Sequence, residues 1–159
     1  AIRPRAFDGA RIGGDLRLDG GNALGELAGY ALAGLTVGGY VDLSGSNVDG
    51  VAAFAFAGTA VGGDVSFGPV GSDIGAIVAH AFTGLSVGGD LDLVSSGVTS
   101  IEPLAFDDLL VGQALRLTGN PALTYVGAAV VAQLRLTNVV LGFTATTACA
   151  AAGRGVTVV

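Results

Sequence analysis

The chain has 159 residues, enough for one sizeable hydrophobic core, and 51% of them are apolar. Its net charge is −6, so it lacks the clustered basic residues that binding to nucleic acid requires. No apolar run approaches the roughly 18 residues of a membrane span, and we therefore expect one domain without a transmembrane segment.

The chain begins in the middle of a repeat. Residues 2–9 align with residues 101–108, the end of a later repeat, and no strand precedes them. We therefore expect the chain to be part of a longer polypeptide or of an assembly. Ile2 and Phe7 are the apolar residues of this incomplete first repeat.

Five short strands are then predicted. Each has two apolar residues separated by one intervening residue, the alternation typical of a strand with one buried face. The apolar pairs are Leu16/Leu18, Val41/Leu43, Val65/Phe67, Leu91/Leu93 and Leu115/Leu117. The strands start 25, 24, 26 and 24 residues apart, and a period of this length predicts a solenoid of stacked units.

Two further motifs accompany each strand. A segment similar to Ala-Phe-x-Gly precedes each strand. The second residues of these segments should stack in one buried column: Phe7, Leu32, Phe56, Phe82 and Phe106. A glycine pair, such as Gly13-Gly14, lies closer to the strand and predicts a tight turn or a close approach between neighbouring backbones. A phosphate-binding loop is the alternative, but such a loop should occur once and open a helix.

The fourth copy shows the pattern most fully. It has Leu91, Leu93, Ser96, Val98 and Ile101, followed by Ala105, Phe106 and Leu109. This order resembles the leucine-rich repeat, in which an Asn often occupies the turn, as Asn120 does in the fifth copy. The resemblance implies an α/β-type right-handed solenoid with one parallel β-sheet and an irregular or short helical convex side. Residues 1–159 would form a single domain of about five full repeats and a shortened C-terminal part.

The C-terminal part is expected to contain two more strands. Residues 133–137 resemble a sixth strand that starts near Leu134, only 19 residues after the fifth. Residues 144–154 are rich in alanine and predict a short helix. Residues 156–159 predict a seventh strand, and Val156 and Val158 would leave an apolar edge at this end, as Ile2 and Phe7 would at the other.

In leucine-rich repeats the concave face of the sheet is the usual binding surface. The residue between the two members of each apolar pair should belong to one row of side chains on this face, and the residue just before each pair to another. Neighbouring strands should lie about 4.8 Å apart. The candidate binding residues from these rows are Tyr40, Asp42, Asp64, Ser66, Asp90, Asp92, Arg116 and Arg135. Asp64 and Asp90 should repel each other, so a basic partner or a Ca²⁺ ion between them is one interpretation. A solvated sheet face with ordinary ion pairs between neighbouring opposite charges, such as Asp92 and Arg116, is the other.

No catalytic constellation is evident, and we expect a protein that is not an enzyme. Cys149 lies among alanines, and the one histidine, His80, lies in a different repeat. The carboxylate pairs lack a cleft that would raise the pKa of one member, as a glycoside hydrolase needs. No cofactor is implied apart from the Ca²⁺ alternative.

Two functions follow from these patterns. The first is a secreted or cell-surface module that binds a protein or a glycan through the concave sheet face. The second is a structural subunit that assembles end to end into a filament or surface layer, because a solenoid without polar caps exposes its strand edges. An ice-binding surface would need a regular array of threonines, which these rows of side chains lack.

Overall fold

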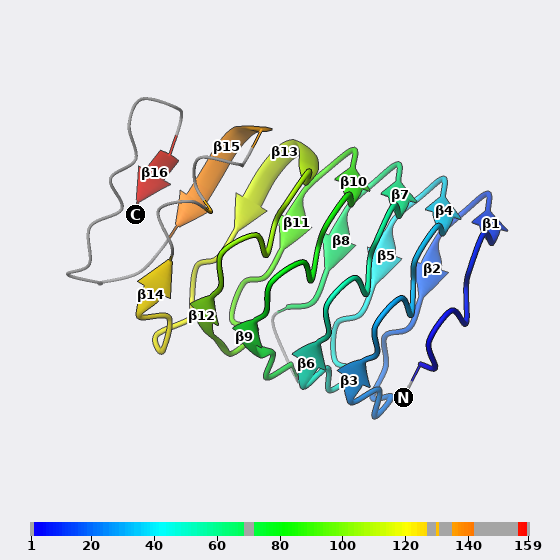
Figure 1. The fold of residues 1–159 in the computed structure, drawn as a ribbon, viewed down its shortest axis with the longest axis horizontal. Helices are drawn as coiled ribbons and strands as arrows, with labels where there is room; N and C mark the ends of the chain where they lie inside the picture. Colours follow the sequence, from blue (N-terminus) through cyan, green and yellow to red (C-terminus); the bar gives the residue numbers. More distant parts are fainter. Residues whose placement is uncertain (1, 69–71, 127–129, 131–134, 142–155, 159) are drawn as a thin grey trace.

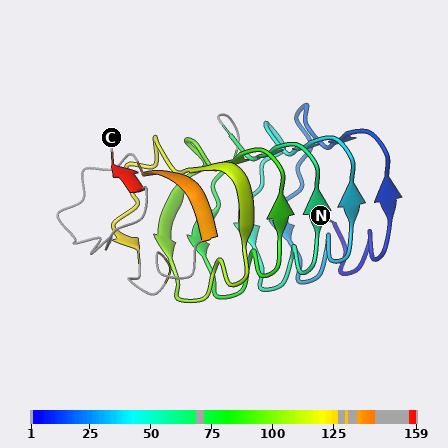
Figure 2. The same ribbon diagram turned by 90° about the horizontal axis from the view of Figure 1, so that it is seen from above.

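The structure is a computed structural model, and it describes residues 2–68, 72–126, 130, 135–141 and 156–158. These residues form a parallel β-solenoid, in which every strand pair is parallel and equivalent strands of successive turns lie side by side (Figures 1 and 2). The predicted solenoid is therefore confirmed. The N-terminal turn lies at one end of the stack and the C-terminal strands lie at the other (Figure 1).

Each turn contributes one short strand to each of three ladders, which run along the solenoid. The first ladder contains β1 (Arg11–Ile12), β4 (Thr36–Val37), β7 (Ala60–Val61), β10 (Ser86–Val87) and the start of β13 (Leu110–Arg116). The second contains β2 (Leu16–Arg17), β5 (Val41–Asp42), β8 (Val65–Ser66), β11 (Leu91–Asp92) and the end of β13. The third contains β3 (Glu26–Leu27), β6 (Gly50–Val51), β9 (Gly75–Ile77), β12 (Val98–Ile101) and β14 (Tyr125–Val126).

The second ladder has the register that the sequence predicts. Leu16 pairs with Val41, Val41 with Val65, Val65 with Leu91, and Leu91 with Leu115. This register places the middle residues of the apolar pairs, such as Arg17 and Asp42, opposite one another, as expected. The alternation of buried and outward residues is thus sufficient to align these strands along the chain.

The prediction of a single sheet is wrong. The described strands form an 11-stranded sheet, a 3-stranded sheet and a 2-stranded sheet. A bend at each glycine pair separates the first ladder from the second in the first four turns. In the fifth turn Gln113 replaces the second glycine, and β13 runs through the corner and joins the two ladders.

Irregular turns connect the third ladder to the first. Residues 4–9, 29–34, 53–58, 79–84 and 103–108 are turns, and none of these five segments is helical. Of the two convex structures that the sequence allows, the irregular one is therefore found in these segments. The predicted helix at 144–154 lies outside the described residues.

The interior is filled by aligned aliphatic and aromatic side chains. Leu32, Phe56, Phe82 and Phe106 are buried and form the predicted column. The ring centroids of Phe56 and Phe82 lie 5.2 Å apart, and those of Phe82 and Phe106 lie 5.5 Å apart. Phe7 occupies the end of this column and is only partly buried, because no earlier turn covers it in the structure.

The C-terminal strands depart from the prediction in register. β15 (Arg135–Leu141) pairs Val139 with Leu115, so the period of 24 residues continues and does not shorten to 19. Arg135 pairs with Leu110 in the first ladder, not with Arg116 in the second. The alternation of residues 134–137 led to an assignment to the second ladder instead of the first. Strands of both ladders alternate apolar and outward residues with the same period of two, so alternation alone does not distinguish them. The final strand is confirmed as β16 (Val156–Val158).

Candidate functional site

The candidate binding face is the outward side of the second ladder. Strand pairing places Arg17 opposite Asp42, Asp42 opposite Ser66, Ser66 opposite Asp92, and Asp92 opposite Arg116. The buried partners on the same strands, Leu16, Val41, Val65, Leu91 and Leu115, point into the core. The period of two therefore sends this second set of side chains outward in a single row. We call these five residues the ladder face.

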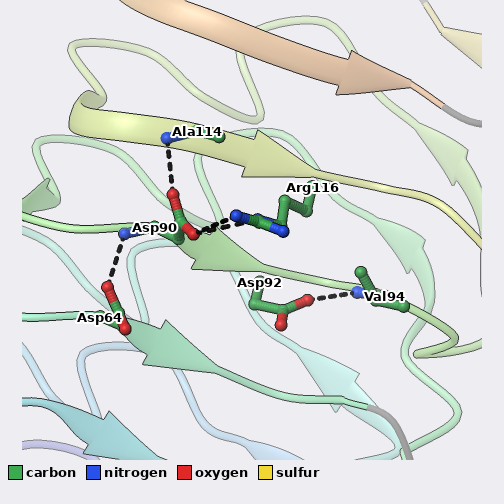
Figure 3. A network of polar contacts seen from close by, with 6 residues as sticks. All are labelled: Asp64, Asp90, Asp92, Val94, Ala114 and Arg116. Carbon is green, nitrogen blue, oxygen red and sulfur yellow. Dashed lines mark hydrogen bonds and ion pairs between the residues drawn. The ribbon is translucent and has the colours of Figure 1, made fainter. Parts of the chain in front are cut away.

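Aspartates at the corner before the ladder face bind the backbone of the next turn. The backbone N–H of Asp90 donates to Asp64 Oδ1 at 2.8 Å, and that of Ala114 donates to Asp90 Oδ1 at 2.8 Å (Figure 3). Tyr40 N–H donates to Asp15 Oδ1 at a longer 3.3 Å. These carboxylates therefore join successive turns where the glycine pair bends the chain.

Asp90 also forms an ion pair with Arg116 of the ladder face. Arg116 donates from Nε to Asp90 Oδ2 at 2.9 Å, and its terminal nitrogen lies 2.7 Å from the same oxygen (Figure 3). The Asp90 side chain is 17% exposed and that of Arg116 is 50% exposed. The sequence suggested Asp92 as the partner of Arg116, but the structure pairs Arg116 with Asp90.

The two aspartates of the ladder face close the turn that follows their strands. Asp42 Oδ1 accepts the backbone N–H of Ser44 at 2.9 Å and its hydroxyl at 2.6 Å. Asp92 Oδ1 accepts the N–H of Val94 at 2.9 Å (Figure 3). Such local bonds to the backbone are common for aspartate at turns. They fix the position of each carboxylate and occupy one of its oxygens.

These contacts place hydrogen-bond donors next to the neighbouring aspartates Asp64 and Asp90. Asp64 and Asp90 do not face each other across an empty gap, since the amide of Asp90 lies against the Asp64 carboxylate and Arg116 lies against Asp90. Within the described part of the chain, no group of three or more His, Cys, Asp or Glu side chains could hold a metal ion. Repulsion between these two carboxylates therefore does not by itself require a cation or a basic partner between them.

The remaining candidate residues lie in different surroundings. Tyr40 precedes β5, and the guanidinium carbon of Arg17 lies 5.2 Å from its ring centroid. Ser66 is half-buried in the middle of the ladder face. Arg135 belongs to the first ladder by its backbone pairing and so is separated from Arg116. Cys149 lies outside the described residues.

The buried Asn120 bonds the backbone of two turns. Its Nδ2 donates to the carbonyls of Leu93 at 2.8 Å and Leu117 at 2.9 Å, and its Oδ1 accepts the N–H of Val98 at 3.0 Å. At the same place in other turns, Ser46 and Ser96 are buried and bond nearby carbonyls. This position is therefore a structural link and not part of an open site.

The structure contains a second aromatic column that the sequence patterns did not predict. Tyr30 stacks on Phe54 with ring centroids 5.4 Å apart, and Phe54 stacks on His80 at 5.0 Å. Arg5 lies over the ring of Tyr30, and Leu104 holds the equivalent position in the turn after His80. The signal was available in the sequence, because each of these residues stands two positions before a member of the buried column.

All five residues of this outer column have a left-handed backbone, with φ between 59° and 64°. Bulky side chains rarely adopt this conformation. The backbone N–H of each of Arg5, Tyr30, Phe54 and His80 donates to the carbonyl of the equivalent residue in the next turn. His80 also contacts Thr83 Oγ1 through Nδ1 at 3.2 Å. His80 is therefore part of a stacked column on the surface.

The residues predicted at the ends of the solenoid do lie there. Ile2 and Phe7 are partly buried against the N-terminal end of the core. Val156 and Val158 belong to β16, the last strand of the large sheet at the other end (Figure 1). In the described part of the structure, no helix is long and apolar enough to cross a membrane.

Comparison with protein-family models, with curated proteins and with solved structures finds no match for this chain.

Proposed function

We propose that the chain is a non-enzymatic binding module, secreted or on the cell surface, that recognises a protein or a glycan through the ladder face. The observation that carries this proposal is the single outward row of Arg17, Asp42, Ser66, Asp92 and Arg116, one residue from each turn. Hydrogen bonds hold Asp42 and Asp92 in place before any partner arrives. A preorganised surface loses less conformational entropy on binding than a mobile one.

The distribution of charge favours a partner with a basic centre. Residues 27–115 contain nine Asp or Glu and no Lys or Arg. Arg17 and Arg116 flank this acidic stretch at the two ends of the ladder face. Complementary charge steers association and selects among partners. A protein segment that carries arginine or lysine suits this pattern better than a neutral glycan does.

The relation to leucine-rich repeats is part of the proposal. It is supported by the 24–26-residue spacing, the buried column that includes Phe82 and Phe106, and the bonds of Asn120 across two turns. The right-handed coil belongs to the same proposal, with a convex side that the described residues build from turns instead of helices.

A charge reversal in the centre of the ladder face tests the proposal. A fluorescent arginine-rich peptide serves as the probe, and its binding is followed by anisotropy over a series of salt concentrations. Ser66→Arg places a cation between Asp42 and Asp92 and should weaken binding at least about tenfold, since each 1.4 kcal/mol is a factor of ten. Affinity for the unchanged protein should fall as salt rises.

Thr36→Arg is the matched control, because it introduces the same charge at an exposed position of the first ladder. Equal losses in both variants would mean that only net charge matters and would contradict a site on the ladder face. A glycan array probed with the unchanged protein distinguishes the glycan alternative. Binding to a neutral glycan that Ser66→Arg abolishes would keep the site and change the partner.

A second candidate function is end-to-end self-assembly into a filament or surface layer. The observation that favours it is the N-terminal strand edge, where β1, β2 and β3 pair with a neighbour on one side only within the described residues. Sedimentation of the purified chain tests it, because assemblies grow with protein concentration. A monomer at every concentration would contradict this second function and leave the first untouched.

A further inference from the structure

We propose that one long side of the solenoid pairs with the same side of a second copy of this chain, in an antiparallel dimer about a two-fold axis. In each turn this side consists of the twelve residues that lead from the third ladder through the first ladder to the glycine pair. In the three central turns these are residues 28–39, 52–63 and 78–89, which we call the uncharged side. The dimer differs from end-to-end assembly and does not depend on binding at the ladder face.

The central turns keep their charged residues away from this side. Residues 28–39, 52–63 and 78–89 contain no Asp, Glu, Lys or Arg. The remainder of each of these turns contains two aspartates: Asp42 and Asp49, Asp64 and Asp73, and Asp90 and Asp92. A surface without charges can be buried without the cost of removing ions from water. Two copies with acidic surfaces elsewhere can therefore approach each other most easily here.

Exposed apolar side chains gather on the same side. Among the described residues, the large apolar side chains classed as exposed are Tyr30, Leu104 and Leu110, which are 42%, 37% and 48% exposed. Tyr30 and Leu104 belong to the outer column, and Leu110 begins β13 in the first ladder. Apolar residues that collect on one part of a surface mark a site of interaction. Aromatic residues such as Tyr30 are enriched at the centres of protein interfaces.

The position of this side excludes the neighbouring turns as its cover. The first ladder runs along one long edge of the stack, parallel to the axis of the solenoid (Figure 1). A further turn at either end would lengthen this side and would not lie over it. A partner of the uncharged side therefore approaches laterally.

The two outer turns give the side a cationic end and an anionic end. Residues 3–14 contain three Arg and one Asp, a net charge of +2, and residues 102–113 contain one Glu, two Asp and no base, a net charge of −3. The two segments are four turns apart, about 19 Å at about 4.8 Å per turn. This separation exceeds the Debye length of about 8 Å at physiological salt, so each end interacts with a partner separately.

A second copy matches this distribution of charge. When two uncharged sides meet antiparallel, the first turn of each copy lies against the fifth turn of the other, and opposite charges meet at both ends. A parallel arrangement would bring like charges together. The neutral third turn would face its own equivalent, as the centre of an isologous contact requires. Any other partner would need an acidic and a basic group at the same separation, which the second copy has by construction.

The dimer leaves the ladder faces open. The glycine pair bends the chain between the first ladder and the second, so contact through the first ladder does not cover Asp42, Ser66 or Asp92. An isologous contact is closed, and no further copy can add through it. The expected product is a dimer of fixed size with two ladder faces, which would favour a partner that carries two binding segments.

The first test is Ala60→Glu in the full chain, followed by analytical ultracentrifugation over a wide concentration range. Ala60 is exposed on β7 in the third turn, so the variant brings two carboxylates together near the two-fold axis. We expect the unchanged protein to dimerise and the variant to bind its copy about a hundredfold more weakly, because like charges at an interface are strongly unfavourable. Thermal unfolding at low concentration, where both proteins are monomeric, should give equal melting temperatures.

Ala76→Glu is the matched control. It makes the same substitution in the same turn, at an exposed position of β9 in the third ladder, where Glu26 is the equivalent residue of the first turn. This variant should dimerise like the unchanged protein. Equal losses in Ala60→Glu and Ala76→Glu would show that net charge alone controls association and would overturn the assignment to the uncharged side.

The second test exchanges the charges of the two ends. Arg11→Glu and Asp107→Arg should each weaken the dimer about tenfold, since each brings like charges together where the first and fifth turns meet. The double variant should restore dimerisation, because opposite charges again face each other. High salt should weaken the unchanged dimer and reduce the effect of each single variant. A double variant that stays as weak as the single ones would overturn the antiparallel arrangement.

The remaining outcomes separate this inference from the two proposed functions. A monomer at every concentration would overturn the dimer and leave binding at the ladder face untouched. Oligomers that grow beyond a dimer and persist in Ala60→Glu would indicate end-to-end assembly and overturn the lateral contact. If Ala60→Glu loses its melting transition, the charge exchange decides, and single variants that dimerise like the unchanged protein would overturn the inference.

Discussion

The first turn and the inner turns carry the same motif but are in different surroundings. Phe7 and Phe82 hold equivalent positions, yet Phe82 is fully buried between neighbouring turns and Phe7 is not. Gly13 and Gly88 are equivalent as well, yet only Gly88 lies against an earlier carbonyl. The comparison teaches that in a solenoid the energetic value of a residue depends on whether both neighbouring turns are present. Matched substitutions in the two regions can measure that dependence.

The largest contrast is expected in the buried column. Phe82→Ala should lower the free energy of unfolding by about 3–5 kcal/mol, because it removes buried apolar area and leaves a cavity between two stacked rings. Phe7→Ala removes the same group from a partly exposed position and should cost less than half as much. Urea denaturation followed by circular dichroism measures both. Equal losses would show that an unseen partner already covers Phe7 in solution.

A smaller contrast is expected at the glycine pair. Gly88→Ala should destabilise the protein by about 1–3 kcal/mol, the usual cost of forcing atoms into a packed interior. The group in its way is a backbone carbonyl of the neighbouring turn, which cannot move without disturbing the ladder. Gly13→Ala should be close to neutral in a monomer, and differential scanning calorimetry compares the two. A neutral Gly88→Ala would contradict the close approach of the turns.

The smallest contrast concerns the aspartates at the corner. Asp90→Ala removes the acceptor of the Ala114 N–H and of the Arg116 guanidinium, and about 1.5–3 kcal/mol is typical for a hydrogen bond to a charged group. Asp15→Ala removes a longer bond at an exposed position and should cost under about 1 kcal/mol. High salt should reduce the difference, because it weakens the ion pair with Arg116. A difference that persists unchanged at high salt would assign the effect to the backbone bond alone.

The outer column shows a further consequence of stacking. Gly9, Gly34, Gly58 and Gly84 hold the second left-handed position of the same turns, where glycine is the natural residue. Tyr30, Phe54 and His80 hold the first left-handed position despite its strain. Ring stacking worth about 0.5–1.5 kcal/mol per aromatic pair offsets this strain. A search for glycine therefore misses these left-handed positions, although their spacing of two residues from the buried column is visible in the sequence.

The candidate site was predicted in part. The sequence placed Arg17, Asp42, Ser66, Asp92 and Arg116 in one row because alternation and a constant repeat length determine which residues meet. It assigned Arg116 to the wrong carboxylate, since Asp90 reaches it diagonally from one residue earlier. It also gave Arg135 to this row, although pairing places that residue in the first ladder.

The sequence by itself determined the solenoid, the parallel register of the second ladder and the buried column of Phe56, Phe82 and Phe106. These features depend on apolar residues that recur with a regular period, and burial of apolar surface is strong enough to impose the pattern on the chain. Only the tertiary structure decided that three ladders surround the core, that carboxylates bind the amides of the next turn, and that the glycines admit a neighbouring carbonyl. These features arise between turns that are 24–26 residues apart, where backbone N–H and C=O groups come into contact. Almost every residue type carries these same groups, so a sequence pattern does not reveal which of them meet.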